Sequence, residues 1–402
     1  MKPTLIALSL FAVTGAAVMF YPASRGAVDT PPDPPLVVPS VQTQNQERPL
    51  VEVVFVLDTT GSMSGLIQAA KDKIWSIAST LAAAQPTPEL RRGLVAYRDR
   101  GDAYVTRVVD LSADLDSMYA TLMEFQAAGG GDGPESVNQA LHEAVERISW
   151  SQNPQTYRTI FLVGDAPPHH DYANDVPYSV SLAAATERGI VVNTIQCGSY
   201  QATTHEWQRI AQLGAGRYFR VDQAGSAIAL TTPYDARLAE LSAALDRTRL
   251  SFGNEAERAA GTRKQEAAEK LHASSSPESR ARRATFNSSA GGERNLLGEN
   301  ELVDAVTSGR VDLDALPEDQ LPEPLRPMAP AEQQAYIEET ARRRDELRRQ
   351  IDVLARERET YLHDQVEALD DAEESLDHKI YSAVRAQAED KGLRYEAEAP
   401  KY

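Results

Sequence analysis

A continuous run of mostly β-branched and aromatic residues, Val51–Leu57, places the strongest constraint on what this chain can fold into. Such a run is typical of a strand that is buried on both faces of a sheet. A helical pattern follows over residues 67–81, and strand and helix patterns then alternate as far as residue 221. This alternation predicts a doubly wound, Rossmann-like α/β domain over residues 49–231, with helices on both faces of a mostly parallel sheet.

The remaining elements of this domain are predicted from the same two periodicities. We expect further strands at Arg92–Tyr97, Tyr104–Val109, Arg158–Gly164, Ile190–Ile195 and Gly216–Val221. We expect further helices at Leu115–Gln126, Ser136–Ile148, Val180–Arg188 and Trp207–Leu213. In such a sheet, ligands bind outside the carboxyl ends of the strands, so the loops at that edge are the first place to look for a site.

Beyond residue 231 the strand patterns stop, which predicts an all-α extension. Residues 232–306 read as helices, except for a Ser-, Arg- and Gly-rich stretch at 273–292 that we expect to be loose. A Pro-rich connector at 307–330 precedes residues 331–392, where the pattern predicts one long helix. Its apolar stripe is thin, so a coiled coil and packing against the earlier helices both fit.

The first 27 residues resemble a targeting segment rather than part of the fold. A basic start, an apolar stretch at Leu5–Phe20 and small residues at Ala23–Ala27 fit either a cleaved signal peptide or a retained membrane anchor. Residues 28–48 are Pro-rich and read as a tether. We therefore expect an exported protein, periplasmic or extracellular, that is either free or anchored to the membrane.

Charge and cysteine content exclude some classes of function. The formal net charge of -18 argues against a nucleic-acid partner, which would need clustered Lys and Arg. Cys197 is the single cysteine, so neither an intramolecular disulfide nor a cysteine zinc site is possible. We expect it to be a buried thiol at the end of a strand.

Three loops at the carboxyl edge of the predicted sheet carry oxygen donors. In the first, the alternate spacing of Asp58, Thr60 and Ser62 lets one turn aim a carboxylate and two hydroxyls at one point. The second is Gly-rich and places Asp132 before a helix, with Glu135 nearby; the third presents Asp165 directly after a strand. Hard oxygen ligands of this kind suit Mg²⁺, and also Ca²⁺ or Mn²⁺.

The three loops in this order resemble the metal-ion-dependent adhesion site of von Willebrand factor A domains. The family pattern Asp-x-Ser-x-Ser reads here Asp58-x-Thr60-x-Ser62, and the third-loop aspartate matches Asp165. The second-loop threonine of the family has no clean match, and Asp132 stands in that loop instead. The stretches DTTGSM, GGGDGPE and GDAPPH are similar to those of exported bacterial A-domain proteins.

The resemblance implies a module that binds a protein partner through its cation, with the partner supplying an acidic side chain. It implies no enzymatic activity. A scaffold that acts or self-associates through its helical tail, with a structural metal, is the alternative, and a hydrolase is a third. Asp99 with its neighbours fits either a structural network or a secondary cation site. His169-His170-Asp171 is expected to be an exposed loop rather than a zinc site, because adjacent histidines point apart.

Overall fold

The computed structural model describes residues 48–65, 67, 75, 78–131, 133–222, 230–366 and 376–395. The targeting segment predicted at residues 1–27 and the tether predicted at residues 28–48 lie outside this range, except for Arg48. Residues Arg48–Tyr402 form one compact unit. Within the described part, no helix is long and apolar enough to cross a membrane.

A six-stranded sheet in the order β3-β2-β1-β4-β5-β6 forms the centre of the first half of this unit. All neighbouring strands are parallel except β2 and β3, which are antiparallel. The strands are β1 (Leu50–Asp58), β2 (Glu89–Tyr97), β3 (Thr106–Ser112), β4 (Tyr157–Gly164), β5 (Ile190–Cys197) and β6 (Ala215–Val221). The predicted α/β class and mostly parallel sheet are confirmed.

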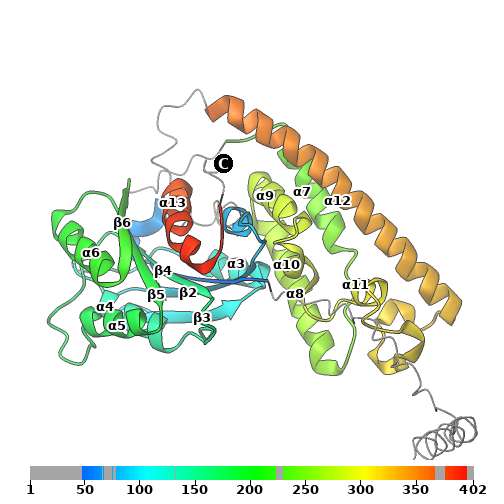
Figure 1. Cartoon of the computed structure of the whole chain (residues 1–402), viewed down its shortest axis with the longest axis horizontal. Helices are drawn as coiled ribbons and strands as arrows, with labels where there is room; N and C mark the ends of the chain where they lie inside the picture. The colour runs from blue at the N-terminus through cyan, green and yellow to red at the C-terminus, as the bar shows by residue number, and fades with distance from the viewer. Residues whose placement is uncertain are drawn as a thin grey trace, which may run out of the picture. The chain divides into compact units, whose positions relative to one another are not determined.

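Alternation along β1 divides the core into two layers, because successive side chains of a strand point to opposite faces. Val51 and Val53 belong to one apolar cluster, whereas Val54 and Val56 belong to the other. The second face is covered by α4 (Val137–Glu146), α5 (Tyr178–Glu187) and α6 (Gln201–Leu213). The face that carries Val51 and Val53 is covered by α3 (Leu115–Glu124), by described helical residues within 64–82, and by α13 (Leu376–Ala388). Figure 1 shows the sheet between these layers.

The second half of the chain is helical, as predicted. Its helices are α7 (Asp235–Asp246), α8 (Glu255–Ser274), α9 (Pro277–Ser288), α10 (Glu293–Leu297), α11 (Leu302–Thr307) and α12 (Pro330–Val366). The 3-10 turns of the unit are η1 (Gly61–Met63), η2 (Leu313–Ala315), η3 (Glu318–Gln320), η4 (Glu323–Leu325) and η6 (Glu389–Lys391). The connector predicted at 307–330 thus contains three of these turns, at η2, η3 and η4.

The prediction of a loose segment at residues 273–292 is wrong, because α9 occupies most of this stretch. The Ser276 side chain caps the helix by accepting from the Ser279 amide, and Pro277 stands in the first turn, where a missing N–H costs nothing. The sequence hid this helix because its inward face includes Arg283, a residue that is fully buried here. Its burial depends on Asp116 of α3, which lies 167 positions away along the chain.

The single helix predicted for residues 331–392 is also corrected, since the structure has α12 and α13, with residues 367–375 outside the described range. α12 packs along α7, α9 and α11 of the same chain (Figure 1). Of the two alternatives, a coiled coil and packing against the earlier helices, the structure therefore has the packing. Two arginines interrupt the apolar stripe of α12, and both are buried against acids. Arg344 binds Glu301 at 2.8 Å, and Arg358 binds Asp235 at 2.7 Å.

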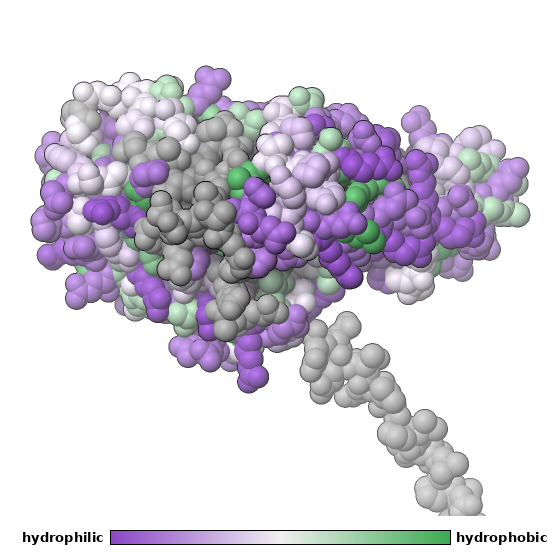
Figure 2. Space-filling model, turned by 90° about the horizontal axis from the view of Figure 1, so that it is seen from above, coloured by the Kyte–Doolittle hydropathy of each residue, from purple (hydrophilic) through white to green (hydrophobic). Residues whose placement is uncertain are grey.

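The face seen in Figure 2 is largely hydrophilic, with small separate apolar areas. The large hydrophobic side chains that are exposed in the described part are scattered, and the two that share α12, Tyr336 and Val353, are 17 positions apart; the others are Val180, Tyr200 and Leu213. Single exposed apolar residues are normal on a protein surface. They do not mark a binding surface, so we turn to the carboxyl edge of the sheet.

Candidate metal centre

Asp58 ends β1 at the carboxyl edge of the sheet and is fully buried. Its Oδ1 accepts hydrogen bonds from the Thr60 amide at 2.8 Å and from the Thr60 hydroxyl at 2.7 Å. The Thr60 hydroxyl lies 3.3 Å from that of Ser62. Alternate residues of this turn therefore bring a carboxylate and two hydroxyls together, as their spacing predicts.

The neighbouring strand β2 fixes this turn. The amide and hydroxyl of Thr59 both donate to the carbonyl of Tyr97, at 2.9 and 2.8 Å. Arg98 Nε donates to the carbonyl of Thr59 at 3.1 Å. Because the register pairs Asp58 with Tyr97, the loop after β1 is held directly against the end of β2.

The Gly-rich second loop lies against the first, and glycine is needed at two positions. Gly129 and Gly130 have φ values of 80° and 77°, in the left-handed region that favours glycine. The Gly61 amide donates to the Gly129 carbonyl at 3.2 Å. A Cβ added to Gly130 would lie 3.2 Å from the Thr60 Cβ, so a side chain there would push the two loops apart.

Glu135 is the acid that the second loop contributes within the described residues. Its amide donates to the Pro167 carbonyl at 2.9 Å, and its carbonyl accepts from the His169 amide at 3.1 Å, which ties the second loop to the third. The side chain is buried and faces Gly130 and Thr60. We predicted Asp132 as the principal ligand here, but Asp132 lies outside the described residues.

Asp165 follows β4, which pairs with β1, so it lies beside Asp58 at the same edge of the sheet. The intervening Gly164 leaves no room for a side chain, because a Cβ there would lie 2.5 Å from the Tyr97 hydroxyl and 2.9 Å from the Asp58 Cβ. Tyr97 is fully buried below the site, a placement that we did not predict. Its position as the last residue of the strand that pairs with β1, opposite Asp58, is the sequence feature that could have indicated this placement.

Burial and mutual repulsion shape the electrostatics of these acids. Burial, together with the charge of Asp165, raises the pKa of Asp58 to about 7. Burial raises the pKa of Glu135 to about 9, and the charges of Asp58, Asp99, Asp102 and Asp165 add to this effect. Several carboxyl groups are thus held close together, and their mutual repulsion adds to the effect of burial.

Two buried oxygens of this site lack a hydrogen-bond partner among the described residues, Oδ2 of Asp58 and Oε2 of Glu135. Buried carboxylate oxygens are nearly always paired, so both are available to a ligand that carries positive charge. Across the described chain, no three His, Cys, Asp or Glu side chains are arranged as a metal cage. A cation here would instead be held by acids and hydroxyls together, as proteins often hold hard cations.

Asp99, the possible secondary ligand, is bonded to protein donors on both oxygens. Ser136 Oγ donates to Oδ1 at 2.9 Å, and the Tyr172 hydroxyl donates to Oδ2 at 2.8 Å. His169 Nε2 lies 3.4 Å from the same Oδ2. These contacts favour a structural network, while Arg98 points away to the carbonyls of Thr59 and Gln126.

The expectation of an exposed loop at His169-His170-Asp171 is wrong for its first residue. His169 is buried, stacks on Tyr172 with ring centroids 4.0 Å apart, and has Nδ1 2.8 Å from Asp171 Oδ1. His170 is exposed and reaches Glu206 at 3.2 Å. The two imidazoles thus face different partners, as expected from their adjacency. Cys197 is buried, as predicted.

The sheet order and the three convergent loops define the class: an open α/β domain with a ligand site where the parallel strands end. Residues 52–232 match the family model of the von Willebrand factor A domain, so this segment of the chain is a von Willebrand factor A domain. Such domains generally bind protein ligands, often through a metal-ion-dependent adhesion site.

Three known proteins are similar in sequence to about a third of this chain. Von Willebrand factor A domain-containing protein 7 of Rattus norvegicus is 37% identical over 120 residues, 30% of this chain and 12% of that protein. Alpha-protein kinase vwkA of Dictyostelium discoideum is 27% identical over 133 residues, 32% of this chain and 21% of the kinase. An ariadne-like RING finger protein of Acanthamoeba polyphaga mimivirus is 23% identical over 121 residues, 30% of this chain and 11% of that protein.

The chain therefore spans between a tenth and about a fifth of the length of these relatives. Among solved structures, proximal thread matrix protein 1 from the mussel byssus matches with a TM-score of 0.33 and 13% identity, covering 44% of this chain and 42% of that one. Another structure of that protein, at 14% identity, has a zinc-occupied adhesion site. Similarity at this level says nothing further about the present chain.

Proposed function

We propose that this protein binds a divalent cation, Mg²⁺ in the first instance, between Asp58, Thr60 and Ser62, with Asp165 and Glu135 beside them. The observation that carries the proposal is the pair of buried, unpartnered carboxylate oxygens on Asp58 and Glu135. Burial and neighbouring carboxylates raise the pKa of both acids, and a bound cation would offset this cost of ionisation. The predicted contribution of Asp132 remains part of the proposal.

We propose further that the bound cation accepts an acidic side chain from a protein partner. Hydroxyl and carboxylate ligands from few residues leave coordination positions that an external oxygen can fill. Ser62 is exposed, so the site opens to solvent on that side. The carboxylate of Glu135 reduces the positive charge that a partner would meet, and we expect a moderate rather than a very tight acidic contact.

Binding rather than catalysis is the role we propose. The buried Cys197 thiol has a pKa well above its usual range, which disfavours the nucleophilic thiolate. Both ring nitrogens of His169 face carboxylates, Nδ1 towards Asp171 and Nε2 towards Asp99. Neither group is therefore placed to activate a nucleophile for a substrate.

An exported location, with the domain free or tethered outside the cytoplasm, completes the proposal. It rests on the sequence pattern of residues 1–27 and the Pro-rich tether at 28–48. Fractionation of cells that express the full chain tests it. Recovery of the intact chain in the cytoplasmic fraction would contradict it.

Calorimetric titration of the full, EDTA-treated chain with MgCl₂ tests the metal site. We expect Asp58→Ala to abolish measurable binding, because it removes the central carboxylate, and Asp345→Asn on the exposed face of α12 to leave binding unchanged. Equal affinities for the wild type and Asp58→Ala would refute the site. Capture of envelope proteins by the wild type and by Asp58→Ala, with and without EDTA, then tests whether the partner contact depends on the metal.

A further inference from the structure

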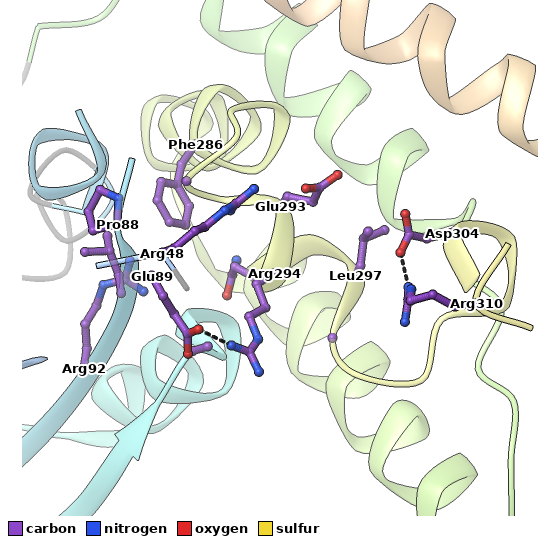
Figure 3. Close-up of a pocket in the computed structure, with 15 residues that line it drawn as sticks. Arg48, Pro88, Glu89, Arg92, Phe286, Glu293, Arg294, Leu297, Asp304 and Arg310 are labelled. Atoms are coloured by element: carbon purple, nitrogen blue, oxygen red, sulfur yellow. Dashed lines mark hydrogen bonds and ion pairs between the residues drawn. The ribbon is translucent and has the colours of Figure 1, made fainter. Parts of the chain in front are cut away.

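A cavity lies at the opposite end of the sheet from the candidate metal site. It has a volume of about 300 Å³ and lies between the first residues of β2 and the α9–α10 region (Figure 3). Leu90 and Arg92 line it from β2, and Phe286 lines it from α9. Because β1 and β2 are parallel and start together at Leu50 and Glu89, this end of the sheet is the one farthest from Asp58.

The acids that line this cavity are already neutralised. Glu89 pairs with Arg294, and Asp304 pairs with Arg310, as the dashed lines in Figure 3 show. Glu293 lies 3.6 Å from Arg348. Two lining cations remain without a carboxylate within ion-pair distance among the described residues, Arg48 and Arg92. Arg48 is exposed and donates one hydrogen bond, to the Ala290 carbonyl at 3.0 Å.

Arg92 is unusual among the buried arginines of this chain. It is only 3% exposed, yet its Nε and Nη2 have no hydrogen-bond partner in the described structure. Its guanidinium lies 5.2 Å from the centroid of the Phe286 ring. Burial without a counter-charge lowers the pKa of Arg92 to about 9. Arg283 and Arg344, which are equally buried, each bind a carboxylate through two nitrogens.

An uncompensated buried cation is costly, so its presence beside a cavity indicates a missing anion. We propose that this cavity binds a small organic oxyanion, a phosphate or carboxylate group on an apolar body, with Arg92 and Arg48 as counter-charges. Planar guanidinium groups suit both oxyanions, because they donate two hydrogen bonds in a fixed geometry. Leu90, Phe286 and Leu297 provide the apolar wall for the rest of the ligand. The volume fits a compact small molecule.

Calorimetry on the full chain at constant ionic strength in chloride buffer tests the proposal with three probes. Phenyl phosphate and benzoate carry the two candidate oxyanions on the same ring, and benzyl alcohol carries none. We expect at least one of the anions to bind to the wild type and the alcohol not to bind. The tighter of the two anions identifies the preferred oxyanion. Alcohol binding as tight as that of both anions would overturn the proposal.

Arg92→Met should weaken anion binding about tenfold or more, because a charge-assisted contact is lost. Arg48→Met should also weaken anion binding, and it tests the site if Arg92→Met does not fold. Arg237→Met removes the same charge from an exposed position on α7 and should change nothing. Asp58→Ala should also bind the probe normally, which separates this site from the proposed metal site. Unchanged affinity in both Arg92→Met and Arg48→Met refutes the assignment.

Thermal denaturation distinguishes a ligand site from a structural arginine. If Arg92 is retained for an anion, Arg92→Met should melt at the same or a higher temperature in chloride buffer, because an unpaired buried charge is removed. The rise in melting temperature that the bound anion gives the wild type should be absent in this variant. A lower melting temperature of Arg92→Met in chloride alone would instead assign Arg92 to the support of Phe286, and would overturn the proposal.

Discussion

Glu135 shows at the scale of one residue how burial and charge together prepare a site. Its backbone joins the second and third loops, while its side chain faces Gly130 and Thr60 of the site. Burial raises its pKa to about 9, so the carboxyl group is neutral at pH 7 in the metal-free protein. A cation would favour the ionised form, so cation binding and proton release are linked.

Stability of the metal-free chain should therefore depend on pH in a defined direction. The folded-state pKa values of Asp58 and Glu135 are raised to about 7 and about 9, above unfolded values near 4. Their contribution to stability is fully present below pH 4 and is lost as the pH rises through those two values. In EDTA we expect the melting temperature to fall between pH 6 and pH 9, and MgCl₂ to reduce that fall.

Glu135→Gln isolates the contribution of this residue. Glutamine resembles the neutral carboxyl group, so the melting temperature in EDTA at pH 7 should stay near that of the wild type. The fall between pH 7 and pH 9 should become smaller, because the group with the higher pKa is gone. Mg²⁺ affinity should decrease by about 10-fold to 100-fold, the usual range for a group that supports a metal. An unchanged Mg²⁺ affinity would remove Glu135 from the site.

At the scale of elements, a buried charge network joins the helical extension to the α/β domain. Arg283 of α9 binds Asp116 of α3 through two hydrogen bonds of 2.6 Å, and it also lies 2.8 Å from Asp246 of α7. All three residues are at most 2% exposed. The nearby Arg283 charge holds the pKa of both aspartates below the usual range against the opposing effect of burial. The network thus fixes α9 against both α3 and α7.

Arg283→Met should destabilise the chain by about 3 kcal/mol, because it removes the main counter-charge of two buried carboxylates, Asp116 and Asp246, and leaves them only Arg249, Lys264 and His272. Urea denaturation at pH 7 measures this loss. Since the folded pKa values of Asp116 and Asp246 are depressed, the stabilisation is present above the unfolded pKa near 4 and is lost as the pH falls below it. The wild type should therefore weaken on acidification more than the variant. Arg237→Met, at an exposed ion pair on α7, is the control and should change little.

At the scale of the whole molecule, the end of the chain returns to complete the core of the α/β domain. Val384 and Ile380 of α13 are buried in the same apolar cluster as Val51 and Phe161 of the sheet. Gln387 Nε2 donates to Asn193 Oδ1 at 2.8 Å, and its Oε1 accepts from the Tyr157 hydroxyl at 2.8 Å. Just after α13, an isolated antiparallel β-bridge joins Arg394 to Gln85. The folded domain thus includes residues far outside 52–232.

Val384→Asp should strongly destabilise the α/β domain, because it places a carboxylate in a fully buried apolar position. We expect the melting transition of the sheet, followed by far-UV circular dichroism, to shift down by many degrees, as a loss above about 3 kcal/mol implies. Val353→Asp makes the same change at a position of α12 that is 57% exposed, and should have little effect. Equal melting temperatures for the two variants would show that α13 does not cover the sheet in solution.

Sequence alone determined the α/β class, nearly all strand positions and the first loop of the site, because each depends on neighbours along the chain. Period-two and period-3.6 patterns mark which faces are buried, and the alternate spacing of Asp58, Thr60 and Ser62 is itself the geometry of the turn. The match of residues 52–232 to the von Willebrand factor A domain supports the family resemblance that the three loops predict. The identity of the metal and its full ligand set stay predictions.

Only the tertiary structure decided what depends on partners distant in sequence. The helix α9 exists in a stretch that looked loose because Asp116 and Asp246 neutralise its buried Arg283. The end of the chain joins the first domain because α13 fills one face of the sheet. Tyr97 meets Asp58 because parallel strands end at one edge, and Glu135 joins them because its backbone bonds to the third loop. Arg92 is buried without a hydrogen-bond partner for two of its nitrogens in the described structure. Burial of charge is set by the whole fold, so no local pattern could reveal it.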